Sequence, residues 1–373
     1  MNKPLNLDGP VEIGAGTYWV GSAAKELLKR NSYLRVFRGN KRTVNLLIDP
    51  GPSLDIEELS SKATMAVGGL SNVQFVYVNH QDPDVIGVAP KLLQLNPKLL
   101  FLMTEDTWRL VQYYGIPKSN FKAVEQFSNL KTVLLTGQEL QFIPTPFCHF
   151  RGACMLYDRE TRILFSGDLF GGIASSELMA TGASWAGIKA FHELYMPNNE
   201  ALRLAVKRIR ELDPPPLFIA PQHGGIVSGP LVEQFLQKLS DLRVGLDIIN
   251  SLDNKIPLLI AAINEILKAA REMLGAAVVK RVMQFFQPDG SYPSIFALAQ
   301  NDTVTDIKAE PFAAVESLAR LLFKECRDGQ RHALQLKILA IFVERDLPPI
   351  ESVIDWEESG KTVEKMNEKQ RVV

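Results

Sequence analysis

This 373-residue sequence has no long hydrophobic run, few cysteines and no pattern of a secretory leader. The most apolar stretch, Ile256–Leu267, contains Asn264 and Glu265 and is shorter than the roughly 18 residues that a transmembrane helix needs. The N-terminus has no apolar core of the kind that a signal peptide carries. The three cysteines, Cys148, Cys154 and Cys326, are an odd and sparse set that does not suggest a disulfide framework. We therefore expect a cytoplasmic protein with no membrane span.

Excess charge of either sign is also absent. The formal net charge is −1, which gives no bulk attraction to nucleic acid or to an anionic membrane. Hydrophobic residues make up 46% and charged residues 22% of the chain, as is typical of a globular protein. The length exceeds that of one ordinary domain, so we expect two domains.

The first part of the chain alternates short apolar runs with helical patterns. Such a mixture predicts a layered α/β domain. The predicted strands are 36–38, 43–48, 73–78, 99–103, 132–135, 140–143, 154–157, 163–166 and 217–220, and the predicted helices are 90–95, 105–114 and 199–212.

The second part carries helical periodicity almost throughout. Its predicted helices are 231–250, 256–274, 276–286, 313–324 and 333–343. The boundaries predicted from this change of pattern are an α/β domain over 1–232, an all-helical domain over 233–356 and a charged, disordered tail over 357–373.

One segment concentrates side chains that can bind a metal. His80, Asp82 and Asp84 alternate directly after the buried strand predicted at 73–78. In extended backbone, alternate residues point to the same side, so the three side chains form a candidate ligand cluster. The plain alternative is a polar turn between a strand and a helix.

Three later residues make the metal interpretation stronger. His149 follows the strand predicted at 140–143, Asp168 follows the strand at 163–166, and His223 follows the strand at 217–220. An open sheet presents functional groups at the ends of its strands, so these side chains can meet those of the first cluster.

The order of these residues resembles the metallo-β-lactamase fold, and within it the flavodiiron and oxygen-binding di-iron branch. Asn79–Gly87 is similar to the branch segment N-H-x-E-P-D-H-x-G, Ile163–Gly171 to I-L-F-S-x-D-x-F-G, and Ala220–Gly224 to A-P-x-H-G. The resemblance covers residues 10 to 230, and it implies an αββα sandwich as the fold of the first domain.

The resemblance also implies a centre of two iron ions of the Fe–O–Fe type. The implied ligands are His80, Asp82, His149 and the bridging Asp168 for one metal, and Asp84, Asp168 and His223 for the other. Zinc hydrolases of the fold typically have a second histidine where this chain has Asp82. The hard carboxylate favours iron or manganese over zinc. Manganese and zinc are the alternatives to iron at this site.

The chain departs from the branch pattern at three points. Asp82 replaces the usual glutamate, and Val85 stands where a histidine is usual, which implies a weaker or more open second metal position. No segment resembles a flavodoxin domain, so we expect no flavin in this chain and any electrons to come from a separate redox donor.

The remaining candidates carry weaker signals. His192 and Tyr195 lie in a segment similar to a tyrosine-rich stretch near the metals of the branch, which implies a supporting or gating role; the alternative is a polar helix face. Cys148 is expected to be a small core residue, and His332 a surface residue at the start of a helix.

Four functions fit this pattern. The leading one is a di-iron protein that binds O2 or NO as a sensor, with its helical domain as an output or dimerisation module. A reductase supplied by an external flavoprotein or rubredoxin is the second, and a zinc or manganese hydrolase the third. A metal-free scaffold is disfavoured because the other ligand positions are filled. The expected partners are O2 or NO, a redox donor and a second copy of the chain, with neither nucleic acid nor membrane.

Overall fold

The computed structural model of the protein describes residues 6–24, 26–175, 177–249, 255–299, 301–327 and 329–354. The chain forms two compact units, Met1–Asp247 and Ile248–Val373. Helix α7 (Pro230–Asp241) packs on α6 (Asn199–Arg210), so the division falls after α7 and not near residue 232.

The tail predicted over 357–373 lies outside the described residues. Of the helices in the described ranges, none is long and apolar enough to cross a membrane.

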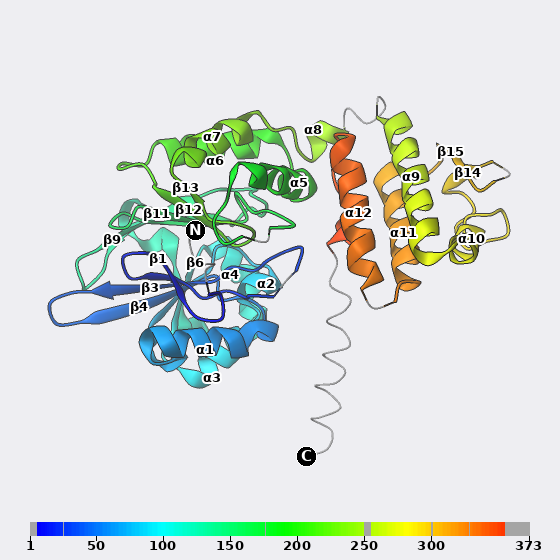
Figure 1. Ribbon diagram of the computed structural model, residues 1–373. Coiled ribbons are helices and arrows are strands. Elements are labelled where there is room, and N and C mark those ends of the chain that lie inside the picture. Colours follow the sequence, from blue (N-terminus) through cyan, green and yellow to red (C-terminus); the bar gives the residue numbers. More distant parts are fainter. Residues whose placement is uncertain are drawn as a thin grey trace, which may run out of the picture. The chain divides into compact units, whose positions relative to one another are not determined.

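Two sheets lie face to face in the first unit (Figure 1). The first sheet contains, in spatial order, β1 (Val11–Gly14), β2 (Thr17–Trp19), β3 (Tyr33–Arg38), β4 (Thr43–Ile48), β5 (Phe75–Tyr77), β6 (Leu100–Met103) and β7 (Phe121–Ala123). The second contains β13 (Val227–Ser228), β12 (Phe218–Pro221), β11 (Ile163–Gly167), β10 (Cys154–Asp158), β9 (Glu139–Pro144) and β8 (Lys131–Val133). Strands β4 to β7 run parallel, and so do β11 and β12. Parallel neighbours place their carboxyl ends at one edge of a sheet.

Helices cover the outer faces of both sheets, which confirms the predicted αββα sandwich (Figure 1). On the first sheet lie α1 (Ile56–Val67), α3 (Ala89–Leu95) and α4 (Glu105–Val111), and on the second α5 (Trp185–Tyr195), α6 and α7. The short helix α2 (Pro83–Ile86) follows β5. The 3-10 turns of this unit are η1 (Ser53–Asp55), η2 (Leu70–Asn72), η3 (Gln112–Tyr114), η4 (Lys118–Asn120), η5 (Val124–Gln126), η6 (Ser128–Leu130) and η7 (Gly182–Ser184).

Apolar side chains fill the space between the sheets and the space beneath the outer helices of the first sheet. The inner cluster joins aromatic residues of both sheets, among them Trp19, Phe142 and Phe165. Each fully buried side chain of this size contributes about 1.5–3 kcal/mol of burial free energy. The shared apolar cluster therefore holds the two sheets together.

Two tyrosine hydroxyls tie the sheets together at the edge where the parallel strands end. The hydroxyl of Tyr77 donates to the carbonyl of Cys154 over 2.5 Å, and that of Tyr33 donates to the carbonyl of Pro221 over 2.7 Å. All four residues lie on strands of facing sheets. These bonds fix the relative position of the strand ends across the sandwich.

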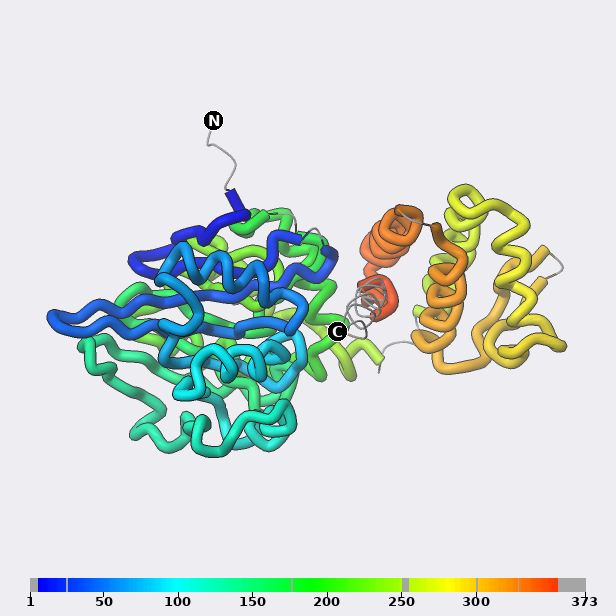
Figure 2. The backbone as a smooth tube through the Cα atoms, turned by 90° about the horizontal axis from the view of Figure 1, so that it is seen from below, coloured from blue at the N-terminus to red at the C-terminus, as the bar shows by residue number. Residues whose placement is uncertain are grey.

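The second unit is mainly helical. Its elements are α9 (Ile256–Leu274), α10 (Ala276–Gln284), β14 (Phe296–Leu298), β15 (Val304–Ile307), α11 (Pro311–Lys324), α12 (Gln330–Glu344) and η9 (Glu351–Val353), and α8 (Leu246–Ile249) precedes them. Figure 2 traces these helices and the hairpin as a tube that runs in colour from yellow-green to red.

The expectation of an all-helical second domain needs one correction, since β14 and β15 form an antiparallel hairpin. Asn264 of α9 holds the hairpin: its amide group donates to the carbonyl of Val304 over 2.8 Å and accepts from the amide of Val304 over 2.9 Å. The helix predicted over 231–250 is also interrupted. It ends at Asp241 because Leu242 is extended, with ψ of 125°, and Gly245 follows with φ of 48°.

Candidate metal centre

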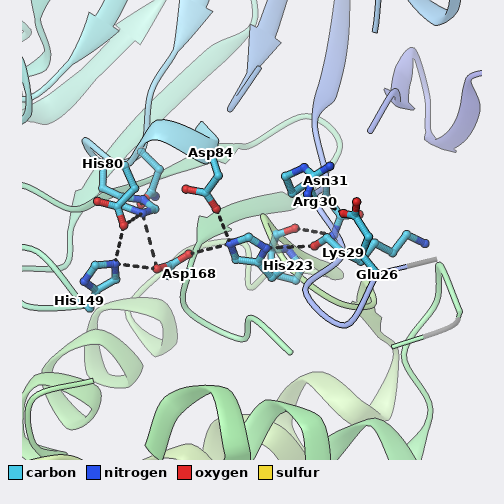
Figure 3. Close-up of polar contacts among 12 residues, drawn as sticks. Glu26, Lys29, Arg30, Asn31, His80, Asp84, His149, Asp168 and His223 are labelled. Carbon is cyan, nitrogen blue, oxygen red and sulfur yellow. Dashed lines mark hydrogen bonds and ion pairs between the residues drawn. The ribbon is translucent and has the colours of Figure 1, made fainter. Parts of the chain in front are cut away.

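Six side chains with metal-binding atoms meet where the strands of the two sheets end (Figure 3). Each comes from a loop or short helix that follows a strand, as the sequence predicts. They are His80 and Asp82 after β5, Asp84 in α2, His149 between β9 and β10, Asp168 after β11, and His223 after β12. Residues distant in the chain are thus brought within bonding range of common metal positions.

Asp168 is the centre of the cluster. Its Oδ2 lies 3.1 Å from Nε2 of His149 and 3.6 Å from Nε2 of His80, and its Oδ1 lies 3.7 Å from Nε2 of His223. The side chain is only 5% exposed, and Oδ1 has no hydrogen-bond partner among the described residues. A buried carboxylate oxygen without a partner is costly unless a cation occupies its free side. The two oxygens of Asp168 therefore face two different groups of ligands.

The first group consists of His80, Asp82 and His149. Oδ2 of Asp82 lies 3.0 Å from Nε2 of His149 and 3.5 Å from Nε2 of His80. A metal with ligand bonds of about 2.1 Å separates neighbouring ligand atoms by roughly 3.0–3.4 Å. Among the described residues, His80, His149 and Asp168 offer ligand atoms that all lie within 4.8 Å of one another, so these three can share one metal ion, and Asp82 lies beside the two imidazoles.

The second group is smaller. Oδ2 of Asp84 lies 3.1 Å from Nε2 of His223, and Oδ1 of Asp168 completes the group. Three protein ligands leave coordination positions free for water or a small molecule. The side chains of Asp82 and Asp84 are 31% and 34% exposed, so the centre is open to solvent on their side.

Hydrogen bonds to the other ring nitrogen orient two of the imidazoles. Nδ1 of His80 lies 3.1 Å from Oδ1 of Asn79, whose amide group donates to the carbonyl of Cys154 over 2.6 Å. Nδ1 of His223 lies 3.0 Å from the carbonyl of Lys29 (Figure 3). A histidine that donates from Nδ1 presents the lone pair of Nε2 to a metal.

The charges of the cluster are balanced between carboxylates and imidazoles. Burial lowers the pKa of both His80 and His149, but the carboxylates of Asp168 and Asp82 offset burial and raise these pKa values to about 9 and about 10. Burial raises the pKa of Asp168, but His80 and His149 hold it well below its usual range. The carboxylates thus need positive charge beside them, which either protons on the imidazoles or metal cations supply. Metal binding must accordingly release protons.

Asp49 lies beside the centre, although it is not among the site residues predicted from the sequence. It follows β4, and its Oδ1 accepts a hydrogen bond of 2.8 Å from the backbone amide of Asn79, next to His80. Burial raises the pKa of Asp49 to about 7, against the lowering effect of that hydrogen bond. The signal in the sequence is its position, because Asp49 directly follows the strand predicted at 43–48.

His192 lies close to the centre, with both of its ring nitrogens occupied. Its Nδ1 lies 2.7 Å from the carbonyl of Ile188, and its Nε2 accepts from the backbone amide of Phe170 over 3.1 Å. Burial lowers the pKa of His192 to about 4, so the ring is neutral. It holds the turn that follows Asp168 and has no nitrogen left for a metal.

Tyr195 and Phe191 of α5 form an aromatic wall beside two of the imidazoles. The ring centroid of Tyr195 lies 6.0 Å from that of His149, and the centroid of Phe191 lies 5.5 Å from that of His223. The two aromatic rings are 4.7 Å apart. This wall shields the centre from the side of α5.

The expectations for two further residues are confirmed. Cys148 is buried, and its Sγ lies 3.6 Å from the carbonyl of Ala201 in α6, so the thiol is a core group. His332 is exposed in the first turn of α12.

Comparisons with known proteins agree with this geometry. The sequence model of a family described as "ODP family beta lactamase" matches residues 28–224. An uncharacterized protein of Methanocaldococcus jannaschii, MJ0732, is 25% identical over 242 residues, which cover 62% of this chain and 60% of that protein. A nitric oxide reductase of Moorella thermoacetica is 24% identical over 230 residues, which cover 58% of this chain and 57% of that enzyme. The chain therefore spans less than two thirds of either curated relative.

A solved structure is also similar. It is the "Peroxy diiron species of chemotaxis sensor ODP", and it aligns with a TM-score of 0.54 and 25% sequence identity. The alignment covers 65% of this chain and 98% of the sensor chain.

Val85 provides a test of the second group of ligands. Val85 stands where the branch pattern has a histidine, but its side chain is fully buried in the apolar cluster beneath the first sheet, with Ile86 and Val88. An imidazole there would meet aliphatic side chains, so we expect a loss of about 2–4 kcal/mol in the free energy of unfolding and no tighter binding of a second metal. Chemical denaturation of the metal-free protein measures the loss. Val85→Leu, an apolar control, should cost less than about 1.5 kcal/mol. Equal stability of the two variants, with tighter metal binding by Val85→His, would show that the side chain faces the metal.

Proposed function

Because this chain belongs to the ODP family of beta lactamases, we propose that its first unit holds two iron ions and binds a diatomic gas, O2 or NO. The observation that carries the proposal is the position of Asp168, whose two carboxylate oxygens face two separate groups of ligands. The similar sensor structure is described as a diiron species, and the Moorella relative is a nitric oxide reductase.

The donor set supports iron. Three carboxylates and three imidazoles offer hard and intermediate ligands, and no cysteine sulfur is among the six side chains. Such a set suits iron or manganese, whereas structural zinc sites prefer fewer ligands and often thiolates. Zinc or manganese hydrolysis remains the alternative chemistry for the same residues.

The residues of the chain have separable tasks in this proposal. Asp168 would hold both metals, one with each carboxylate oxygen, and the hydrogen bonds of His80 and His223 orient their rings. The exposed side of Asp82 and Asp84 gives a small ligand access, while the aromatic wall limits access from α5. When bound, the two irons supply a redox-active pair with open positions for a small molecule.

The share of each relative's length that aligns with this chain favours a sensor over a reductase. The chain accounts for 98% of the similar sensor chain but for only 57% of the nitric oxide reductase. We propose that the helical second unit acts as an output or dimerisation module, and that a separate redox donor sets the oxidation state of the iron. A reductase supplied by an external flavoprotein or rubredoxin is the second candidate.

Substitution of the bridging residue tests the two-metal arrangement. We expect Asp168→Asn to lose both irons, because each metal position depends on its carboxylate, whereas His223→Ala should retain about one iron per chain. Metal analysis of each variant, after folding is verified by circular dichroism, gives the answer. Asp106→Ala, which removes an exposed carboxylate on α4, is the control and should bind as much iron as the unmodified protein. Equal iron retention by Asp168→Asn and His223→Ala would contradict the assignment.

Gas binding tests the function itself. We expect the anaerobically reduced, iron-loaded protein to change its visible spectrum with a fixed stoichiometry when O2 or NO is added. Continued O2 consumption with NADH alone should be absent, because electrons have to come from another protein. An unchanged spectrum with both gases would refute gas binding. Sustained rapid consumption without a carrier would instead support a self-contained reductase, and stoichiometric zinc in protein from cells supplied with both metals would support a hydrolase.

A further inference from the structure

An apolar cavity of about 280 Å³ lies in the first unit, away from the metal centre. It is formed by the first sheet, by Phe127 and by the β8–β9 hairpin. The lining residues that matter here are Phe37, Leu46, Phe75, Leu100, Lys122 and Thr132. Phe75 and Leu100 are the first residues of β5 and β6, whereas His80 follows the end of β5. The cavity therefore opens at the opposite edge of the sheet from the metal ligands.

The lining of the cavity contains a single charged residue, Lys122. Its Nζ lies 2.6 Å from Oε1 of Gln126 and 5.6 Å from the ring centroid of Phe127. Its cationic group is thus held beside the ring of Phe127 in the lining. Among the described residues, no carboxylate forms an ion pair with Lys122.

Two more cations lie in the turn next to the cavity. Lys41 and Arg42 are exposed between β3 and β4, and this turn lies against the turn that ends β8. The side-chain amide of Gln138 donates to the backbone carbonyl of Arg38 over 3.3 Å, and this hydrogen bond joins the two turns. In the described part of the chain, neither Lys41 nor Arg42 has a carboxylate partner, so positive charge is available on this side of the cavity.

Apolar side chains continue from the cavity to the surface. Val133 is 65% exposed and Leu135 is 79% exposed, and both line the cavity. Exposed apolar residues that continue into an apolar hollow mark a binding site for a ligand with an apolar body. The cations beside it favour a ligand whose polar end is an anion.

We propose that this cavity binds a medium-chain fatty acid, with its acyl chain between the sheets and its carboxylate beside Lys122. The volume is about twice that of the roughly 150 Å³ apolar cavity that holds benzene, which suits a chain of roughly eight to ten carbons. A thin alkyl chain fits a hollow between two sheets, and its carboxylate finds the cation that the lining provides. This proposal is independent of the metal centre.

Calorimetric titration of the full-length protein with decanoate, below the micellar concentration, tests the proposal. Decyltrimethylammonium has the same chain with the opposite charge, and we expect it to bind at least tenfold more weakly. Thr132→Trp places an indole in the cavity from the edge strand β8 and should weaken decanoate binding at least tenfold. Lys122→Gln should weaken it severalfold, while the control Arg109→Gln, on α4 and outside the cavity, should have no effect.

Three results would overturn the proposal. One is equal affinity for decanoate and for decyltrimethylammonium, and another is unchanged decanoate binding in a folded Thr132→Trp variant. If that variant does not fold, Leu134→Trp provides the same test from the adjoining turn. The third is self-association of the unmodified protein in sedimentation experiments that Thr132→Trp abolishes, which would identify this face as a contact between copies of the chain.

Discussion

The burial of the Asp168 carboxylate is the interaction on which the rest of the first unit depends. Removing one partner of a buried charge pair typically costs about 3–5 kcal/mol, because the other charge remains without compensation. Asp168 is compensated by three imidazoles from three different loops, and its Oδ1 still has no hydrogen-bond partner among the described residues. The cluster is therefore stable only when positive charge, carried by protons or by metal ions, lies between the carboxylates and the imidazoles.

This requirement explains the form of the scaffold. The six side chains of the candidate centre come from both sheets, so a shift of one sheet by an ångström would separate atoms that would share a metal. The cross-sheet hydrogen bonds of Tyr77 and Tyr33 and the aromatic core between the sheets prevent such a shift. Arg35 of β3 and the fully buried Asp158 of β10 add an ion pair of 2.6 Å across the same interface. The hydrogen bond that the backbone amide of Phe170 donates to Nε2 of His192 fixes the turn after Asp168.

Much of this arrangement follows from the sequence, because strand-end position and residue type are both visible there. The alternation of His80, Asp82 and Asp84 after an apolar run predicts a ligand cluster, and the structure brings these side chains together with the later three. Asp49 was missed, since its task is to bind a backbone amide and only the fold shows which amide. The β14–β15 hairpin was missed for the same reason, because a side chain of α9 supplies two of its hydrogen bonds. The orientation of Val85 is likewise set by the apolar cluster beneath the sheet and not by its own segment.

The central claim is that Asp168 bridges two iron ions within one cluster. X-ray diffraction from crystals of the iron-loaded protein, with data collected on both sides of the iron absorption edge, tests it most directly. The account predicts two anomalous peaks about 3.5–4 Å apart. One peak should lie among His80, Asp82 and His149, the other beside Asp84 and His223, with the Asp168 carboxylate between them. A single peak, two peaks that Asp168 does not join, or a signal that appears only at the zinc edge would contradict the account.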